Sequence, residues 1–95
     1  MDTNPGDIVY SKAGRDKAGF FVVMATDGEY ALICDGKKRK IDKPKRKKIK
    51  HLKLGVGYSD FIANKLAVDE RVTNLEVRRE LSEFNKTDIQ NEGGD

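Results

Sequence analysis

The chain has 95 residues, of which 19 are Lys or Arg and 16 are Asp or Glu, giving a formal net charge of +3. This length accommodates one small domain and excludes a large cofactor-binding enzyme. No apolar run approaches the roughly 20 residues that cross a bilayer, and the N-terminus lacks a secretory signal, so we expect a cytoplasmic protein without a membrane partner. A single cysteine, Cys34, excludes an intramolecular disulfide and is too little for a zinc site. A hydrophobic core must therefore hold the fold together.

The positive charge is concentrated in one segment, residues 37–53, which we call the basic island. It holds eleven basic residues and one acidic residue, a net charge of +10. Residues 1–36 have a net charge of −3 and residues 54–95 a net charge of −4. Such an uneven distribution of charge predicts a polyanionic partner.

The first half of the chain predicts a mainly β fold. A Gly-Asp pair precedes a β-rich run at residues 6–11, and the most apolar segment, residues 20–24, is expected to be the core strand. Asp-Gly pairs at 27–28 and 35–36 predict tight hairpin turns with positive φ at both central residues.

These turns imply five short antiparallel strands. The expected strands cover residues 6–11, 20–26, 29–34, 37–41 and 49–52. Closely spaced short strands of this kind predict a small five-stranded SH3-like barrel over residues 1–54.

Residues 55–85 predict a short two-helix extension. After a flexible joint at Gly55 and Gly57, Ser59 is an expected N-cap for a helix over residues 60–67. The remaining residues, 86–95, are polar and predict a disordered tail.

The second predicted helix has a stronger start signal and a clear apolar face. Thr73 and Glu76 have the spacing of a capping box. Val77, Leu81 and Phe84 then recur at helical spacing and form one apolar stripe, which must pack against a partner surface.

The basic island is the main candidate site. Its cations repel one another, and a phosphate backbone would neutralise them while releasing condensed counterions, so nucleic acid is favoured over a merely solvated face. A turn at Pro44 is expected to place residues 37–40 and 45–50 on adjacent strands. Residues 43–48 also match the basic cluster of a nuclear localisation signal. The candidate contacts are Lys37, Lys38, Arg39, Lys40, Lys43, Lys45, Arg46, Lys47, Lys48, Lys50 and His51.

The segment between residues 11 and 19 is the second candidate. Its glycines would let the backbone approach a phosphate, with Lys12, Arg15 and Lys17 as donors, although an ordinary hairpin loop explains it equally well. It is not a P-loop, because no Lys-Ser/Thr pair follows the second glycine.

Residues suited to catalysis do not form a set. His51 has no nearby nucleophile in the sequence, and Cys34 lies in an apolar strand, where a buried structural thiol is expected. Tyr10, Tyr30 and Tyr58 could stack on unpaired bases, but core packing is favoured for the first two. We therefore expect no enzyme activity, no cofactor, no metal and no small-molecule substrate.

Residues 6–23 resemble the KOW motif of translation and transcription proteins, with a Gly-Asp-opened strand, a glycine-bearing basic loop and an apolar strand. The continuation at 30–36 and the basic stretch at 39–52 look like bacterial KOW-domain RNA-binding proteins. Those are similar to the large-subunit ribosomal proteins of the fourteen-e, six-e and twenty-seven-e group. The resemblance covers roughly residues 6 to 53, with Ala18 where the motif more often has glycine. It implies an SH3-like barrel that binds ribosomal RNA of the large subunit.

Two functions are consistent with these features. The leading expectation is a noncatalytic, ribosome-associated protein that recognises folded RNA by shape, through phosphate contacts. The alternative is a protein-interaction adaptor, in which the C-terminal helices recruit a ribosomal or other protein partner and the acidic tail shields the basic island.

Overall fold

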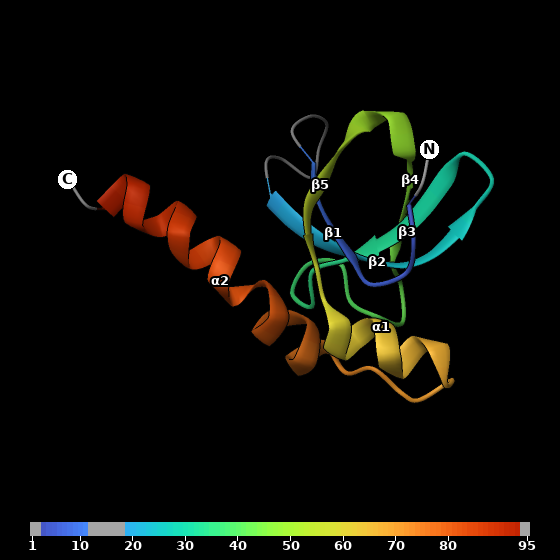
Figure 1. The fold of residues 1–95 in the computed structure, drawn as a ribbon. Coiled ribbons are helices and arrows are strands. Elements are labelled where there is room, and N and C mark those ends of the chain that lie inside the picture. The colour runs from blue at the N-terminus through green and yellow to red at the C-terminus, as the bar shows by residue number, and fades with distance from the viewer. Residues whose placement is uncertain (1–2, 12–18, 94–95) are drawn as a thin grey trace.

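A computed structural model describes residues 3–11 and 19–93, with side chains described as far as Asn85 (Figure 1). The described residues form five strands and two α-helices, which confirms the prediction of a mainly β fold followed by two helices. In chain order they are β1 (Asp7–Ser11), β2 (Gly19–Asp27), β3 (Tyr30–Cys34), β4 (Lys45–Lys48), the 3₁₀ turn η1 (Ile49–His51), β5 (Leu52–Tyr58), α1 (Asp60–Ala67) and α2 (Asn74–Gly93).

The strands form one antiparallel sheet in the order β4-β3-β2-β1-β5. Its two edge strands are joined only by η1, which bridges β4 and β5 in Figure 1. In a flat sheet they would lie ~19 Å apart, whereas the chain from Lys48 to Leu52 reaches only ~14 Å when fully extended. The sheet must therefore curl, and register shifts between Ile8 and Tyr10 and between Val23 and Ala25 supply local bends. Within the described residues no ladder joins β4 to β5, so the sheet is open and closure into a barrel is not confirmed.

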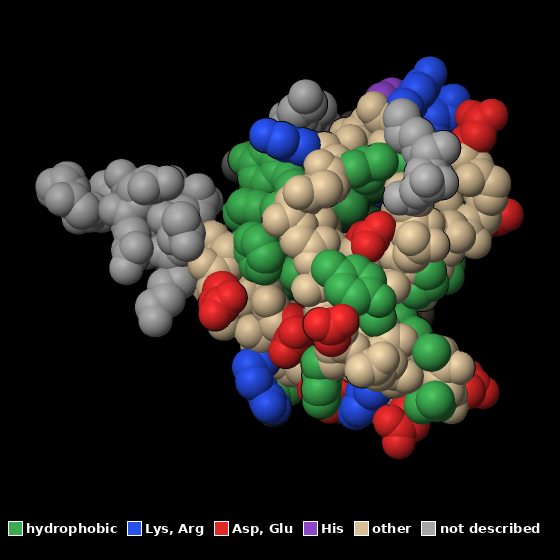
Figure 2. Space-filling model, in the orientation of Figure 1, with side chains coloured by type: hydrophobic (Ala, Val, Ile, Leu, Met, Phe, Trp, Pro, Cys, Tyr) green, Lys and Arg blue, Asp and Glu red, His purple; other side chains and the backbone are tan. Residues whose placement is uncertain are grey.

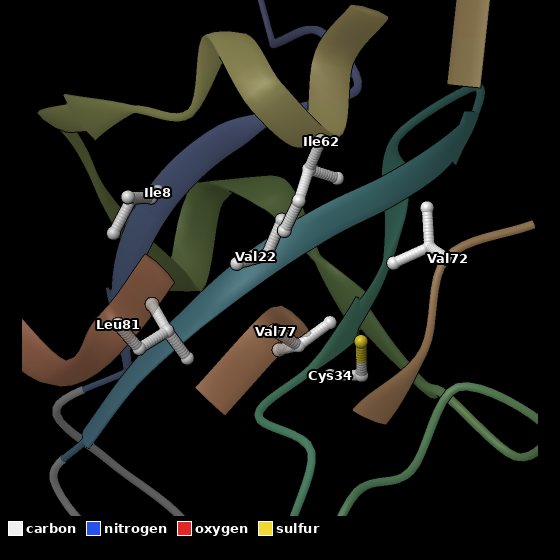
Figure 3. Close-up of a cluster of buried hydrophobic side chains, with 7 residues drawn as sticks. All are labelled: Ile8, Val22, Cys34, Ile62, Val72, Val77 and Leu81. Carbon is white, nitrogen blue, oxygen red and sulfur yellow. The ribbon is translucent and has the colours of Figure 1, made fainter. Parts of the chain in front are cut away.

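Both faces of the curled sheet are buried at its centre, as the three consecutive buried residues at 21–23 in β2 indicate. One face packs against the helices, and Figure 3 shows side chains of the strands and helices converging there. This first cluster contains Ile8, Val22, Cys34, Ile62, Val72, Val77 and Leu81. The second cluster, on the other face, contains Val9, Phe21, Val23, Ala31, Ile33, Ile49 and Leu52. The predicted core strand is thus confirmed as the centre of the molecule.

Helix α1 begins at the predicted cap. The Ser59 hydroxyl oxygen accepts a hydrogen bond from the Ile62 backbone N–H at 3.1 Å and donates one to Glu80 Oε1 in α2 at 2.7 Å. Because Ser59 is 2% exposed, these bonds satisfy a buried hydroxyl and also tie the start of α1 to α2.

Helix α2 begins with the predicted capping box. The Glu76 backbone N–H donates to Thr73 Oγ1 at 3.1 Å, and the Thr73 N–H donates to Glu76 Oε1 at 2.9 Å. The second Glu76 oxygen accepts a hydrogen bond from Lys65 Nζ of α1 at 2.6 Å. The same carboxylate therefore caps α2 and links it to α1.

These contacts lower the pKa of Glu76 below its ordinary value of 4.5, first through the Lys65 hydrogen bond and then through the Thr73 backbone N–H. A lowered pKa in the folded state stabilises the protein above the ordinary value, and this contribution is lost as the pH falls through the lowered pKa. We expect Glu76→Gln to reduce the free energy of unfolding more at about pH 7 than at about pH 3. Urea denaturation at the two pH values measures this difference, and an equal loss at both would contradict the role given to the carboxylate.

Two expected strands are wrong in position or type. Residues 37–41 form bends and a turn, because the Asp35 carboxylate accepts the backbone N–H groups of Lys37 and Arg39, each at 2.9 Å, which closes a compact turn. Residues 49–51 form η1 rather than a strand, and Leu52 is the first residue of β5.

The glycines also differ from expectation. The first hairpin forms, but its loop is Gly28-Glu29, and Asp27 stays in β2 opposite Tyr30. Residues 55–57 are part of β5 rather than a flexible joint. An added Cβ at Gly57 would lie 2.6 Å from Cζ of Phe84, so the Phe84 ring would have to move to accommodate it. The α2 backbone continues to Gly93, and side chains beyond Asn85 lie outside the described part, so the predicted disordered tail at 86–95 stays a prediction.

Candidate nucleic-acid interface

Strand β4 carries four consecutive cations on an edge of the sheet. It pairs only with β3 among the described strands, with Tyr30 opposite Lys48 and Leu32 opposite Arg46. Four basic residues have little intrinsic β-propensity, so the strand forms because β3 provides the ladder and the lysine stems cover neighbouring apolar surface. Lysines on an edge strand also oppose edge-to-edge aggregation. The pairing of β4 with β3 therefore places four consecutive cations on an ordered edge strand.

The register of β4 divides these cations between the two faces of the sheet. Directly opposed residues of an antiparallel pair project to the same face, so Arg46 and Lys48 share the face of Tyr30. The Arg46 guanidinium carbon lies 3.6 Å from the centroid of the Tyr30 ring, and Lys48 Nζ lies 5.9 Å from it. Arg46 Nη2 also lies 3.8 Å from Oδ2 of Asp27. The edge therefore combines cations with an aromatic ring.

The segment between β3 and β4, residues 35–44, forms what we call the basic loop, and α2 holds its backbone. Arg78 Nη1 donates a hydrogen bond to the Gly36 carbonyl oxygen at 2.8 Å, and the Ile41 N–H donates to Asn74 Oδ1 at 2.8 Å. Gly36 has a φ of +79°, and an added Cβ would lie 2.6 Å from the Asn74 carbonyl oxygen. Helix α2 thus fixes the course of the loop.

The side chains of the basic loop point mainly to solvent. Arg39 is half-buried, whereas four lysines are exposed, namely Lys37, Lys38, Lys40 and Lys43. Since the anchors engage only backbone atoms of the loop, these lysine side chains remain available to a ligand.

The turn η1 continues the basic surface beyond β4. Ile49 is buried and its N–H donates to the Glu29 carbonyl oxygen at 2.8 Å, while Lys50 and His51 are exposed. Figure 2 shows Lys and Arg side chains beside the histidine at the upper edge of this view. A shallow cavity of about 260 Å³ lies between the first hairpin and η1 and is lined by Gly28, Glu29, Lys48, Ile49 and Lys50.

The structure brings most of the predicted site residues into one continuous arrangement of basic loop, β4 and η1. Of the two predicted arms, only the second contains a strand, at Lys45–Lys48, since residues 37–40 lie in the loop and residues 49–50 in η1. Lys12, Arg15 and Lys17 lie outside the described residues, and their predicted phosphate contacts stay a prediction. Asn74 and Arg78 were missed as supports of the site, because nothing local in the sequence connects them to a loop more than thirty residues earlier.

Cys34 and Tyr10, which the sequence also singles out, have structural roles. Cys34 is fully buried, which confirms the predicted buried thiol, and burial, followed by the charge of Asp35, raises its pKa to about 12. Tyr10 packs on Phe20 with ring centroids 4.9 Å apart, and Phe20 packs on Phe84. Among the described residues, no cluster of His, Cys, Asp and Glu is arranged to hold a metal ion.

The apolar stripe on which the adaptor hypothesis depends is already covered. Val77 and Leu81 are fully buried against the sheet, so they contact β-strand residues of the same chain. A protein partner of the helices would have to use other apolar side chains, of which Tyr58, Phe61, Val68 and Leu75 are exposed.

None of the helices in the described part of the chain is long and apolar enough to cross a membrane. No protein-family model matches the chain, and no curated protein matches it.

Proposed function

We propose that this protein is a noncatalytic RNA-binding protein that contacts RNA phosphates through the basic loop, β4 and η1. The observation that carries the proposal is that the basic island, with its net charge of +10, is ordered along the basic loop, β4, η1 and the start of β5 and exposes most of its cations at the surface. Such a surface attracts a polyanion, and counterion release from the phosphate backbone supplies the free energy of binding.

The proposed fold is an SH3-like barrel of the KOW type. Two features support it: the sheet is curled, and a single 3₁₀ turn joins its two edge strands. The resemblance of residues 6–53 to KOW-domain proteins supports ribosomal RNA of the large subunit as the target, and hence a cytoplasmic, ribosome-associated role. Phosphate contacts give affinity and position without reading bases, so the main mode of recognition is the shape of a folded RNA.

The proposal predicts a strong dependence of affinity on salt. If about six phosphates are neutralised, a plot of log K against log salt for a duplex-like RNA has a slope near −5. Fluorescence anisotropy of a labelled RNA duplex over a series of salt concentrations measures this slope. A slope near zero would show that the basic surface does not bind the phosphate backbone.

The ribosomal part of the proposal is tested by the same salt series on density gradients. Tagged protein is expected to co-sediment with large ribosomal subunits at low salt and to leave them at high salt. Protein that binds the RNA duplex but never co-sediments would retain the RNA-binding proposal and exclude the ribosomal target.

A further inference from the structure

The face of the first hairpin carries a stacked pair of side chains that phosphate binding alone does not require. Tyr30 is the first residue of β3, directly after the Gly28-Glu29 turn, and the Arg46 guanidinium lies over its ring at 3.6 Å. Asp27 lies 3.8 Å from the same guanidinium. Arg46 is thus held between an aromatic ring and a carboxylate.

This arrangement orients the guanidinium plane while leaving it accessible. The Arg46 side chain is 55% exposed and Asp27 is 75% exposed, and an exposed ion pair of this kind adds little to stability. Contact with a phosphate uses the N–H donors at the edge of the guanidinium and does not require an aromatic ring against its face. The side of the guanidinium turned away from Tyr30 is a flat surface on which another planar group can stack.

Lys48, whose Nζ lies 5.9 Å from the Tyr30 ring centroid, connects this pair to the cavity of about 260 Å³ that Lys48 and Lys50 border. Its walls are connected by the hydrogen bond from the Ile49 N–H to the Glu29 carbonyl oxygen. An added Cβ at Gly28 would meet nothing within 4 Å, so the approach over the turn is open. The cavity is therefore bordered by two lysines, one of which, Lys48, also lies near the ring that supports Arg46.

We propose that this end of the sheet binds an unpaired nucleotide of the RNA. Its base stacks on the outer side of Arg46, and the adjoining phosphate contacts Lys48 and Lys50 at the rim of the cavity. A base within a helix has both of its faces covered by neighbouring pairs, so only a bulged or looped-out nucleotide can occupy the site. This inference rests on the proposed RNA-binding function and adds to it a preference for RNA that contains an unpaired base.

The test compares two RNA duplexes that differ only in one bulged 2-aminopurine nucleotide at the centre. Their ends are identical, so stacking of the duplex ends on the protein cancels from the ratio of the two affinities. The protein is expected to bind the bulged duplex about tenfold more tightly, and the 2-aminopurine fluorescence is expected to change as the base moves from its neighbouring bases onto the guanidinium. Equal affinities without a fluorescence change would overturn the inference but leave the proposed function intact, whereas binding of neither duplex would overturn both.

Two variants assign the preference to the stacked pair. Arg46→Lys keeps the charge but removes the planar group, so the affinity ratio is expected to fall to about one and the fluorescence change to disappear. Tyr30→Phe is the matched control, because it keeps the aromatic support and is expected to retain the ratio. A ratio that survives Arg46→Lys would place the unpaired nucleotide elsewhere on the protein.

Discussion

Replacing Leu81 with alanine is expected to lower the free energy of unfolding by about 2–5 kcal/mol, because a buried leucine is lost and a cavity is left behind. Leu81 is fully buried and lies between α2 and the sheet, in the cluster that contains Ile8 and Val22 (Figure 3). Urea denaturation followed by circular dichroism measures the loss. The magnitude is a large part of the total stability of a domain of this size.

Leu75→Ala is the matched control, since it makes the same change in the same helix at a side chain that is 57% exposed. Its effect is expected to stay within about 0.5 kcal/mol. If both variants lost equally little stability, α2 would not pack on the sheet in solution. The role given to α2 in holding the basic loop would then fail as well.

The helices and the sheet share one core, so the helices are structural rather than appended. Ile62 and Val72 join Leu81 in the same cluster as residues from three strands. Removing residues 58–95 would therefore uncover one face of the sheet. A change in RNA affinity would then reflect both unfolding and the loss of acidic charge, and the two effects would not be separable. Single substitutions such as Leu81→Ala separate these effects better than truncation.

Elements with a strong local pattern were predictable from the sequence. The apolar runs of β1, β2 and β3 were found, because alternating and consecutive apolar residues reflect burial directly. The starts of α1 and α2 were found from their caps, which depend on residues three positions apart. In these elements the interactions that fix the conformation lie within the segment itself.

Features fixed by distant contacts were not predictable. The Asp35 carboxylate closes the first turn of the basic loop, but Asn74 and Arg78 in α2 hold the rest of the loop backbone. The cationic sequence of the loop alone therefore did not distinguish it from a strand. The sequence predicts a flexible joint at Gly57, whereas this residue packs closely against Phe84, twenty-seven residues later. In the candidate site, charge was visible in the sequence, but the pairing of Arg46 with Tyr30 depends on the β3–β4 register.

Reversing the charge of two exposed lysines in the basic loop, with Lys38→Glu and Lys40→Glu together, is expected to weaken RNA binding by about 100-fold. Each lost charge-assisted hydrogen bond to phosphate costs about 1.5 kcal/mol, or roughly tenfold in affinity. The salt slope should also become shallower by about 2, because two fewer phosphates are neutralised. Anisotropy titrations of the variant and the original protein, at several salt concentrations, measure both quantities.

The matched control is Arg71→Glu with Arg79→Glu, two exposed cations outside the basic loop, β4 and η1. Both double variants change the net charge by the same amount, so a difference between them reports position rather than total charge. The lysine variant should also keep its fold, because α2 holds the loop through backbone atoms of Gly36 and Ile41. If the arginine variant lost as much affinity as the lysine variant, RNA would be responding to the overall charge of the protein, and the ordered basic surface would not be its binding site.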